Sequence, residues 1–289
     1  MSNDKTPEYF TVAELAELLR LKERKIYDLA ASGEVPCSRA TGKLLFPARD
    51  VYAWIASHTT GPQGAEDRPP ILLGSHDPLL DWAVRESSCG LATYFDGSLD
   101  GLDRFKAREG VACGLHVYHP KAGDWNVPSV DKTQDAVLIG FARRRRGLVV
   151  RPDEAGITGL EDLAGRRFAP RQPLSGTAKL FGDLAGEAGL DHAALDLAPI
   201  SRTETEAVQA VARGEADATF GLETLARDFG LRFLPLIEEF FDLLIDRREY
   251  FEGPVQALLD FCRGEAFRDQ AARLGGYDLA DLGAIRWNA

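Results

Sequence analysis

An alternation of short strand-like segments with helical segments is the feature that most constrains the fold of this chain. The strand-like segments are residues 71–73, 90–95, 111–118, 167–169 and 216–220. Strands that alternate with helices in this way are typical of an α/β fold with a parallel sheet. In such sheets, ligands bind where the carboxyl ends of strands meet the N-termini of helices.

Two segments of this α/β region resemble each other. Residues 107–116 and 212–223 both run from a helix end through a tight turn into a short strand, followed by Gly-Leu and a polar residue. The simplest account is a pair of lobes that face each other. We therefore predict a two-lobed domain with parallel or mixed sheets, whose second lobe spans about residues 150–238.

Four consecutive arginines, residues 143–146, separate the strand-like segments 136–141 and 147–151. Runs of like charge are usually solvated. We therefore expect a solvated turn or sheet edge at this point, with an anion trap as the alternative. The apolar residues of the segment 240–244, which are Phe240, Phe241, Leu243 and Leu244, are expected to form a core strand that returns between the lobes, rather than an interface.

The start of one helix in the second lobe has the residue types of an anion site. Ser175 has the side chain of an N-cap, Gly176 and Thr177 leave backbone N–H groups uncovered, and Arg171 lies four residues upstream. A helix N-terminus attracts anions because its first N–H groups lack intrahelical partners and its dipole is positive there. Small residues also mark three loops of the first lobe, where the backbone can approach a ligand closely: residues 74–77, 96–101 and 114–116.

The N-terminal residues are expected to form a small helical module. Thr11 and Glu14 make a capping-box pattern at the start of one amphipathic helix, and a second helix follows over residues 22–31. A hairpin with a basic tip then leads to a third helix near Pro47. The predicted boundaries are residues 1–58 for the module, 59–70 for a flexible linker rich in Gly and Pro, and 71–289 for the α/β region.

Length and charge narrow the classes of function. The chain has 289 residues, of which 45% are hydrophobic, and this composition excludes a disordered chain. The net charge is −11, yet residues 1–60 hold eight Lys or Arg and eight Asp or Glu, so the remainder carries the whole deficit. An acidic body argues against broad coating of nucleic acid but permits one small DNA-reading surface.

The sequence also bears on location. No apolar run approaches the roughly 20 residues of a membrane span, and the first residues lack the layout of a secretory signal. The four cysteines form no CxxC pair. We expect a cytoplasmic protein with buried thiols, without a membrane partner.

The N-terminal module resembles a known DNA-binding fold. Residues 9–58 carry helix, tight turn, helix, basic hairpin and helix, with Ile26-Tyr27, Gly33, Pro36 and Gly42-Lys43 at matching spacing. This order is similar to the winged helix-turn-helix of excisionase-type proteins. The resemblance implies that the second helix enters the major groove of double-stranded DNA while the wing contacts the backbone or minor groove. The implied DNA-binding residues are Arg24, Lys25, Tyr27, Arg39, Thr41 and Lys43.

The alternative for this module is protein binding, with its charges merely solvated. If it binds DNA, one copy makes too few phosphate contacts for tight specific binding, so a homodimer on a two-fold site is expected.

The α/β region resembles one family of regulators. Residues 74–80, 147–152, 171–177 and 214–218 have its residue types. Members join an excisionase-like DNA-binding domain to a type-2 periplasmic-binding-protein-like domain. The resemblance implies a ligand-sensing transcription regulator that closes on a small anion, and the binding-protein relatives include molybdate and tungstate binders. The ligand-binding residues carried over are Ser75, His76, Gly97, Ser98, Arg171, Ser175, Gly176, Thr177, Thr203 and Thr205.

Two positions depart from the family pattern. Ala178 stands where a basic residue is usual, and Glu204 stands where a histidine is usual. A carboxylate in the cleft would repel a dianion. Either Glu204 points away from the ligand, or the ligand is an organic molecule with a cationic or donor group.

Catalysis is the rival class of function. Ser75, His76 and Asp77 are adjacent in sequence, whereas a triad needs side chains that converge from different segments. The chain has no G-x-S-x-G elbow and no Walker loop. His116 and His119 would point to opposite faces of a strand, so we expect no metal site and place His116 in the cleft. We therefore predict no catalytic residues and no cofactor beyond a bound oxyanion.

Overall fold

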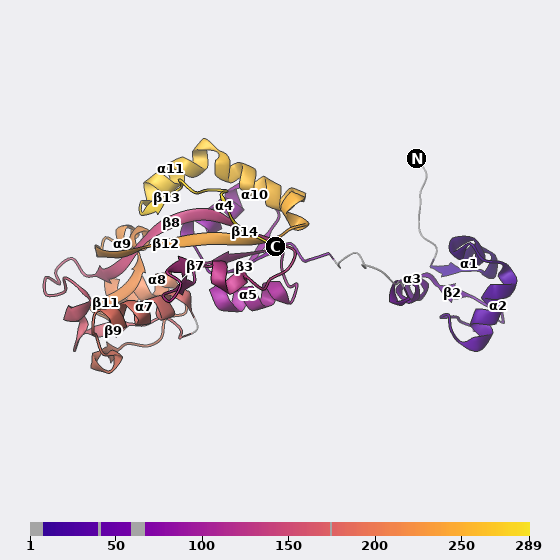
Figure 1. The fold of residues 1–289 in the computed structure, drawn as a ribbon, viewed down its shortest axis with the longest axis horizontal. Helices are drawn as coiled ribbons and strands as arrows, with labels where there is room; N and C mark the ends of the chain where they lie inside the picture. Colours follow the sequence, from indigo (N-terminus) through magenta and orange to yellow (C-terminus); the bar gives the residue numbers. More distant parts are fainter. Residues whose placement is uncertain (1–7, 40–41, 59–66, 174) are drawn as a thin grey trace. The chain divides into compact units, whose positions relative to one another are not determined.

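The computed structural model describes residues 8–39, 42–58, 67–173 and 175–289. Contacts divide the chain between Asp67 and Arg68 into two compact units, which Figure 1 draws as ribbons. The N-terminal unit is a small helical module, and the C-terminal unit is a mixed α/β domain. This arrangement confirms the predicted fold class. None of the helices in the described ranges is both long and apolar enough to cross a membrane.

The described part of the N-terminal unit holds helices and a two-stranded sheet. Its elements are β1 (Tyr9–Phe10), α1 (Val12–Leu19), α2 (Glu23–Ser32), β2 (Phe46–Pro47) and α3 (Ala48–Ser57). The predicted capping box begins α1, since the Thr11 N–H donates to the Glu14 carboxylate at 2.8 Å and the Glu14 N–H donates to Thr11 Oγ1 at 3.3 Å. Gly33 ends α2 in the left-handed conformation that favours glycine.

One apolar core holds this unit together. Leu15 of α1, Ile26 of α2 and Val51 of α3 are fully buried, and all three belong to a single apolar cluster. The hairpin closes through antiparallel pairing of Ser38 with Leu45. Residues 40–41 at its tip, including Thr41, lie outside the described residues.

A single mixed sheet forms the centre of the C-terminal unit. From edge to edge its strands are β10 (Asp196–Leu197), β9 (Arg167–Ala169), β11 (Ala218–Leu222), β8 (Ala136–Val150), β12 (Arg232–Asp246), β5 (Ala112–Leu115), β3 (Ile71–Gly74) and β4 (Ala92–Phe95). Strands at both ends pair in parallel, while β8 and β12 pair antiparallel through the middle. We call the end with β3, β4 and β5 lobe 1, and the end with β9, β10 and β11 lobe 2.

Helices cover both faces of each lobe. In lobe 1, α4 (Pro78–Glu86), α10 (Gly253–Arg263) and α11 (Glu265–Leu274) pack on one face, and α5 (Ser98–Lys106) packs on the other, as Figure 1 shows. In lobe 2, α7 (Gly176–Glu187) packs on one face, and α8 (Glu204–Ala212) with α9 (Glu223–Asp228) covers the other. The lobes therefore have separate apolar cores joined by β8 and β12.

Smaller elements complete the unit. They are the hairpin of β6 (Tyr118–His119) and β7 (Asp124–Trp125), helix α6 (Val127–Val130), strands β13 (Tyr277–Asp278) and β14 (Ile285–Asn288), and the short helical turns η1 (Leu160–Leu163), η2 (His192–Ala194) and η3 (Glu249–Phe251).

The prediction for the arginine run was wrong. Residues 143–146 form no turn, because β8 continues through them as one 15-residue strand. Arg144 and Arg146 are buried, with 1% and 0% of their surface exposed. Burial is tolerated because carboxylates from distant parts of the chain meet both guanidinium groups, as buried charges require. The expected core strand over residues 240–244 is confirmed as part of β12.

Arg68 lies within the range expected for a linker, yet it is tied to lobe 1. Its Nε atom donates to Asp246 at 2.7 Å, and its Nη1 atom donates to the carbonyl oxygens of Phe105 and Gly110. Residues 59–66 of that expected linker lie outside the described residues.

Candidate functional site

A small cavity of about 30 Å³ lies between the two lobes of the C-terminal unit. Lobe 1 contributes Ser75, His76, Phe95, Asp96, Gly97 and His116, and lobe 2 contributes Arg171, Ser175, Thr177, Arg202, Thr203 and Glu204. The loops that follow β3, β4 and β5 meet the N-termini of α7 and α8 here. This is the place that the strand and helix order predicted.

On the lobe 1 side, small hydroxyl residues hold the loops together. Ser75 Oγ and Ser98 Oγ lie 2.8 Å apart, and Ser98 Oγ accepts the His116 N–H at 3.1 Å. Ser98 itself is fully buried and does not line the cavity. Of the predicted residues, Ser98 therefore positions the loops, while Ser75 and His116 border the cavity.

On the lobe 2 side, Ser175 is the expected N-cap of α7. Its hydroxyl accepts the Ala178 N–H at 3.1 Å and donates to the Gln172 carbonyl at 2.8 Å. Arg171 donates to the Ser201 carbonyl oxygen at 2.7 Å. Its Nε atom is buried and has no partner among the described residues. The helix N-terminus and this guanidinium are the groups that an anion would contact.

Two threonines at the start of α8 have different positions. Thr203 lines the cavity, but its hydroxyl is committed to capping α8, where it accepts the Glu206 N–H at 3.0 Å. Thr205 is not among the residues that line the cavity.

The lobes touch beside this cavity. A Cβ atom added at Gly176 would lie 3.0 Å from the backbone oxygen of His116 and 3.0 Å from its Cε1 atom. Only glycine leaves the N-terminus of α7 this close to lobe 1, which explains the glycine of the Ser-Gly-Thr segment.

A buried network of charges crosses from lobe 1 to lobe 2 beneath the cavity. Arg144 donates to Asp77 at 2.9 Å and also to Glu239. Arg146 donates to Glu239 at 2.8 Å and to Glu204 at 3.0 Å. These two arginines and Glu239 were not predicted as part of the site, because their partners lie far away along the chain.

Asp77 closes the lobe 1 end of this network. Its Oδ1 atom caps α4 by accepting the Leu80 N–H at 2.8 Å, and its Oδ2 atom accepts from Arg144 and from the Tyr277 hydroxyl, each at 2.9 Å. The Asp77 carboxylate therefore serves the fold and does not form a triad with Ser75 and His76.

His116 contacts the same network. Its Nδ1 atom lies 3.1 Å from Glu239 Oε2. Burial lowers the pKa of His116, although the Glu239 carboxylate opposes this effect. The ring is therefore neutral near pH 7, with its proton on Nδ1, because a carboxylate can only accept.

Glu204 does not point away from the cleft. It is 4% exposed, and its Oε1 atom accepts from Arg146 at 3.0 Å and from Thr177 Oγ1 at 2.5 Å. Its Oε2 atom is buried and has no partner among the described residues. Burial favours the neutral acid, but Arg146 and Arg171 outweigh it and lower the pKa of Glu204 to about 2. A carboxylate anion therefore lines the cleft.

Metal binding finds no support in this part of the molecule. Across the residues that the structure describes, no group of three His, Cys, Asp or Glu side chains is arranged to hold a metal ion.

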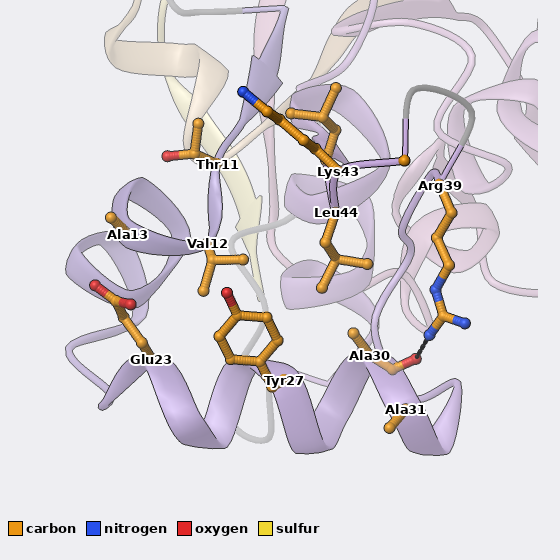
Figure 2. Close-up of a pocket in the computed structure, with 12 residues that line it drawn as sticks. Thr11, Val12, Ala13, Glu23, Tyr27, Ala30, Ala31, Arg39, Lys43 and Leu44 are labelled. Atoms are coloured by element: carbon orange, nitrogen blue, oxygen red, sulfur yellow. Dashed lines mark hydrogen bonds between the residues drawn. The ribbon is translucent and has the colours of Figure 1, made fainter.

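A second concave surface lies on the N-terminal unit and is shown in Figure 2. This groove, of about 910 Å³, runs between α2, the hairpin and the start of α1. Tyr27 projects from α2 towards Val12. Arg39 and Lys43 line the same groove from the hairpin. Arg39 donates to the Ala30 carbonyl at 3.3 Å, so it also ties the hairpin to α2.

The predicted DNA-binding residues divide into two groups. Tyr27, Arg39 and Lys43 line the groove, and Tyr27 is 53% exposed. Arg24 and Lys25 are exposed on α2 but do not line the groove.

Comparisons with known proteins agree with this division into units. A family profile described as "Helix-turn-helix domain" matches residues 9–59, and one described as "PBP superfamily domain" matches residues 81–263. The uncharacterized protein YvgK of Bacillus subtilis is 24% identical over 301 residues, covering 96% of this chain and 97% of that protein. An uncharacterized protein encoded near a 2Fe-2S ferredoxin gene of Clostridium pasteurianum is 33% identical over 76 residues, covering 26% of this chain and 67% of that protein.

A solved structure gives the same fold. It is a putative phosphate transporter substrate-binding protein from Clostridium perfringens with bound phosphate, and it aligns with a TM-score of 0.53 at 13% identity, over 71% of this chain and 96% of that one. At this identity the likeness shows the fold alone. Because the superfamily profile covers more than half of the sequence, this chain belongs to the PBP superfamily, with a helix-turn-helix domain ahead of its binding-protein-like domain.

Proposed function

We propose that this protein is a ligand-responsive DNA-binding regulator of transcription. The observation that carries the proposal is the presence, in one chain, of a helix-turn-helix domain and a two-lobed domain with a polar cleft. The first suggests DNA binding, and the second suggests a small-molecule ligand. The regulator would act in the cytoplasm, where it meets DNA.

The DNA contacts would come from α2 and the hairpin. Arg24 and Lys25 are exposed on α2, where basic side chains can meet phosphates or guanine edges. Tyr27, Arg39 and Lys43, which line the groove, would follow, and Thr41 belongs to the proposal from the sequence alone. A homodimer on a two-fold site belongs to the proposal, because one such module makes few phosphate contacts.

The ligand would act through the lobes. A ligand shifts an equilibrium only by as much as it prefers one state, so it must bind one lobe arrangement better than the other. The contact between Gly176 and His116 across the cleft supports closure at this place.

A small anion is the proposed ligand, and the ligand expected from the sequence was an oxyanion such as molybdate or tungstate. The N-terminus of α7 and the buried Nε atom of Arg171 support an anion, whereas the hydroxyl protons of Ser175 and Thr177 are already donated to Gln172 and Glu204. The ionised Glu204 carboxylate opposes a fully deprotonated dianion. It favours the alternative, a small organic metabolite that brings a donor group. Catalysis is not part of the proposal, since Asp77 is committed to α4 and Arg144.

A selection from a random pool of duplex DNA tests the regulator proposal. The enriched site should then bind the full chain more tightly than a scrambled duplex in fluorescence anisotropy. Replacing Arg24 and Lys25 by Ala should weaken binding and lower the slope of log affinity against log salt by about 0.9 for each lost phosphate contact. Arg49→Ala, exposed on α3, is the matched control. A pool that yields no enriched sequence would refute the proposal.

A further inference from the structure

One oxygen atom of the buried Glu204 carboxylate, Oε2, has no hydrogen-bond donor among the described residues. The side chain comes from the first residue of α8, lines the cavity and is 96% buried, and its Oε2 atom has no partner among the described residues. An ionised carboxylate oxygen only accepts hydrogen bonds. Leaving it dry and unpaired is strongly unfavourable.

The nearby arginines are already engaged with carboxylates. Arg146 divides its donors between Glu204 and Glu239, and Arg144 divides its donors between Asp77 and Glu239. With Arg171 added, three guanidinium groups face three carboxylates, so this region is close to neutral when His116 is neutral. A ligand that brings only negative charge and acceptor oxygens would find no compensation for Glu204.

The opposite wall of the cavity presents hydrogen-bond donors, which need acceptor atoms. The α7 N-terminus at Ser175 and Thr177 and the buried Nε atom of Arg171 are donors, and they require acceptor oxygens. The cavity of about 30 Å³ has room for only about one water molecule, so a larger ligand needs the lobes to part. To match both walls, such a ligand must both donate and accept hydrogen bonds.

His116 adds a second acceptor on the lobe 1 side. Its Nδ1 proton is directed to Glu239 at 3.1 Å, so the other ring nitrogen of the neutral imidazole carries a lone pair. His116 from lobe 1 and Glu204 from lobe 2 therefore both line the cavity, and each side chain carries an acceptor atom.

We infer that the effector is a small anion that also carries at least one O–H or N–H group, which it donates to Glu204 Oε2 as the cleft closes. This inference rests on the proposed function and names the chemistry of its ligand. It places singly protonated oxyanions and small hydroxy or amino acids inside the ligand class. It places sulfate, molybdate and tungstate outside that class, because they have no proton to donate near neutral pH.

The test is calorimetric titration of the full chain at pH 7 with matched pairs of anions. Inorganic phosphate, which keeps a proton at this pH, is paired with sulfate, molybdate and tungstate, and glycolate, which has a hydroxyl, is paired with acetate. We expect the donor-bearing member of at least one pair to bind about 100-fold more tightly or better, as sites built to hydrogen-bond a ligand reject analogues that lack the group.

Two variants distinguish the hydrogen-bonding role of Glu204 from the general effect of one negative charge on α8. Glu204→Gln presents an amide that can donate, so the preference within the responding pair should shrink to less than about 10-fold. Glu206→Gln, on the same helix but exposed, removes the same charge and should keep the preference. The comparison within each pair uses the wild-type chain, so it holds even if Glu204→Gln folds poorly.

The outcomes are distinct. Sulfate, molybdate, tungstate or acetate binding as tightly as its donor-bearing partner would overturn the inference while leaving the regulator proposal intact. A chain that binds none of these anions would overturn both the inference and the cleft as an anion site. Selective, Glu204-dependent binding by a chain that selects no DNA sequence would support the inference and refute the regulator proposal.

Discussion

The substitution Glu239→Gln tests whether the charge network holds the two lobes of the C-terminal unit together. Glu239 is fully buried and accepts from Arg144, from Arg146 Nε at 2.8 Å and from His116 Nδ1 at 3.1 Å. Glutamine keeps the size of the side chain but removes the charge. It also turns an N–H group towards donors that need an acceptor.

The expected loss follows from the burial of these partners. Removing one member of a buried ion pair costs about 3–5 kcal/mol, because the remaining charge stays buried without compensation. The slope of stability against urea is about 3 kcal/mol/M at the upper end of the usual range, and it rises with chain size. The urea midpoint of the C-terminal unit should therefore fall by about 1 to 1.7 M.

The measurement is urea unfolding at pH 7, followed by tryptophan fluorescence, to which the buried Trp125 and two other tryptophans of the C-terminal unit, Trp82 and Trp287, contribute together with Trp54 of the N-terminal unit. Glu238→Gln is the control, since Glu238 is the neighbour on β12, is exposed, and should change the free energy of unfolding by less than about 0.5 kcal/mol. Equal midpoints for the two variants would refute the claim that Glu239 compensates the buried arginines.

Three further predictions concern the cleft and the start of the domain. Gly176→Ala should weaken ligand binding, because its Cβ would meet the opposite lobe at 3.0 Å, whereas Gly186→Ala on the same helix has open space and should leave affinity unchanged; calorimetry compares them. Glu204 has a pKa of about 2 against an ordinary 4.5, so its contribution of about 3 kcal/mol is present above pH 4.5 and lost as the pH falls towards 2. Glu204→Gln should flatten that part of a plot of urea midpoint against pH, and an unchanged plot would contradict the shift. Arg68→Ala should lower the urea midpoint of the C-terminal unit by about 1 M or more, because Asp246 would stay buried without its partner; a midpoint within error of the wild type would contradict this.

Features that depend on neighbouring residues could be predicted from the sequence. The capping box of Thr11 and Glu14 and the N-cap at Ser175 join atoms only three residues apart, so a local pattern contains both partners. The strand and helix order also predicted which loops would border the cleft, since connections in parallel sheets place those loops at one edge. The capping role of Thr203 is equally local, but it removes that hydroxyl from the ligand.

The arginine run shows the limit of such local patterns. In isolation, four consecutive charges favour solvent, and nothing within ten residues of Arg144 or Arg146 supplies a buried carboxylate. Their partners Asp77, Glu204 and Glu239 are 58 to 95 residues away. One signal was available: apolar strand residues flank the run on both sides, with no proline and only Gly140 and Gly147 as glycines between Ala136 and Val150. A two-residue alternation then places Arg144 and Arg146 on one face of β8.

The ion pair of Arg146 with Glu204 links lobe 2 to the strands that both lobes share. Because Arg146 lies on β8, which both lobes share, its bond to Glu204 ties the start of α8 to the strands that join the lobes. A ligand that donates to the free oxygen of Glu204 leaves this bond in place and adds its own contacts to α7. An anion without a proton would instead place uncompensated negative charge beside Glu204, and a medium of low dielectric makes that repulsion costly. Under the proposed function, ligand choice and lobe closure would depend on the same carboxylate, and closure would be selective for one chemistry.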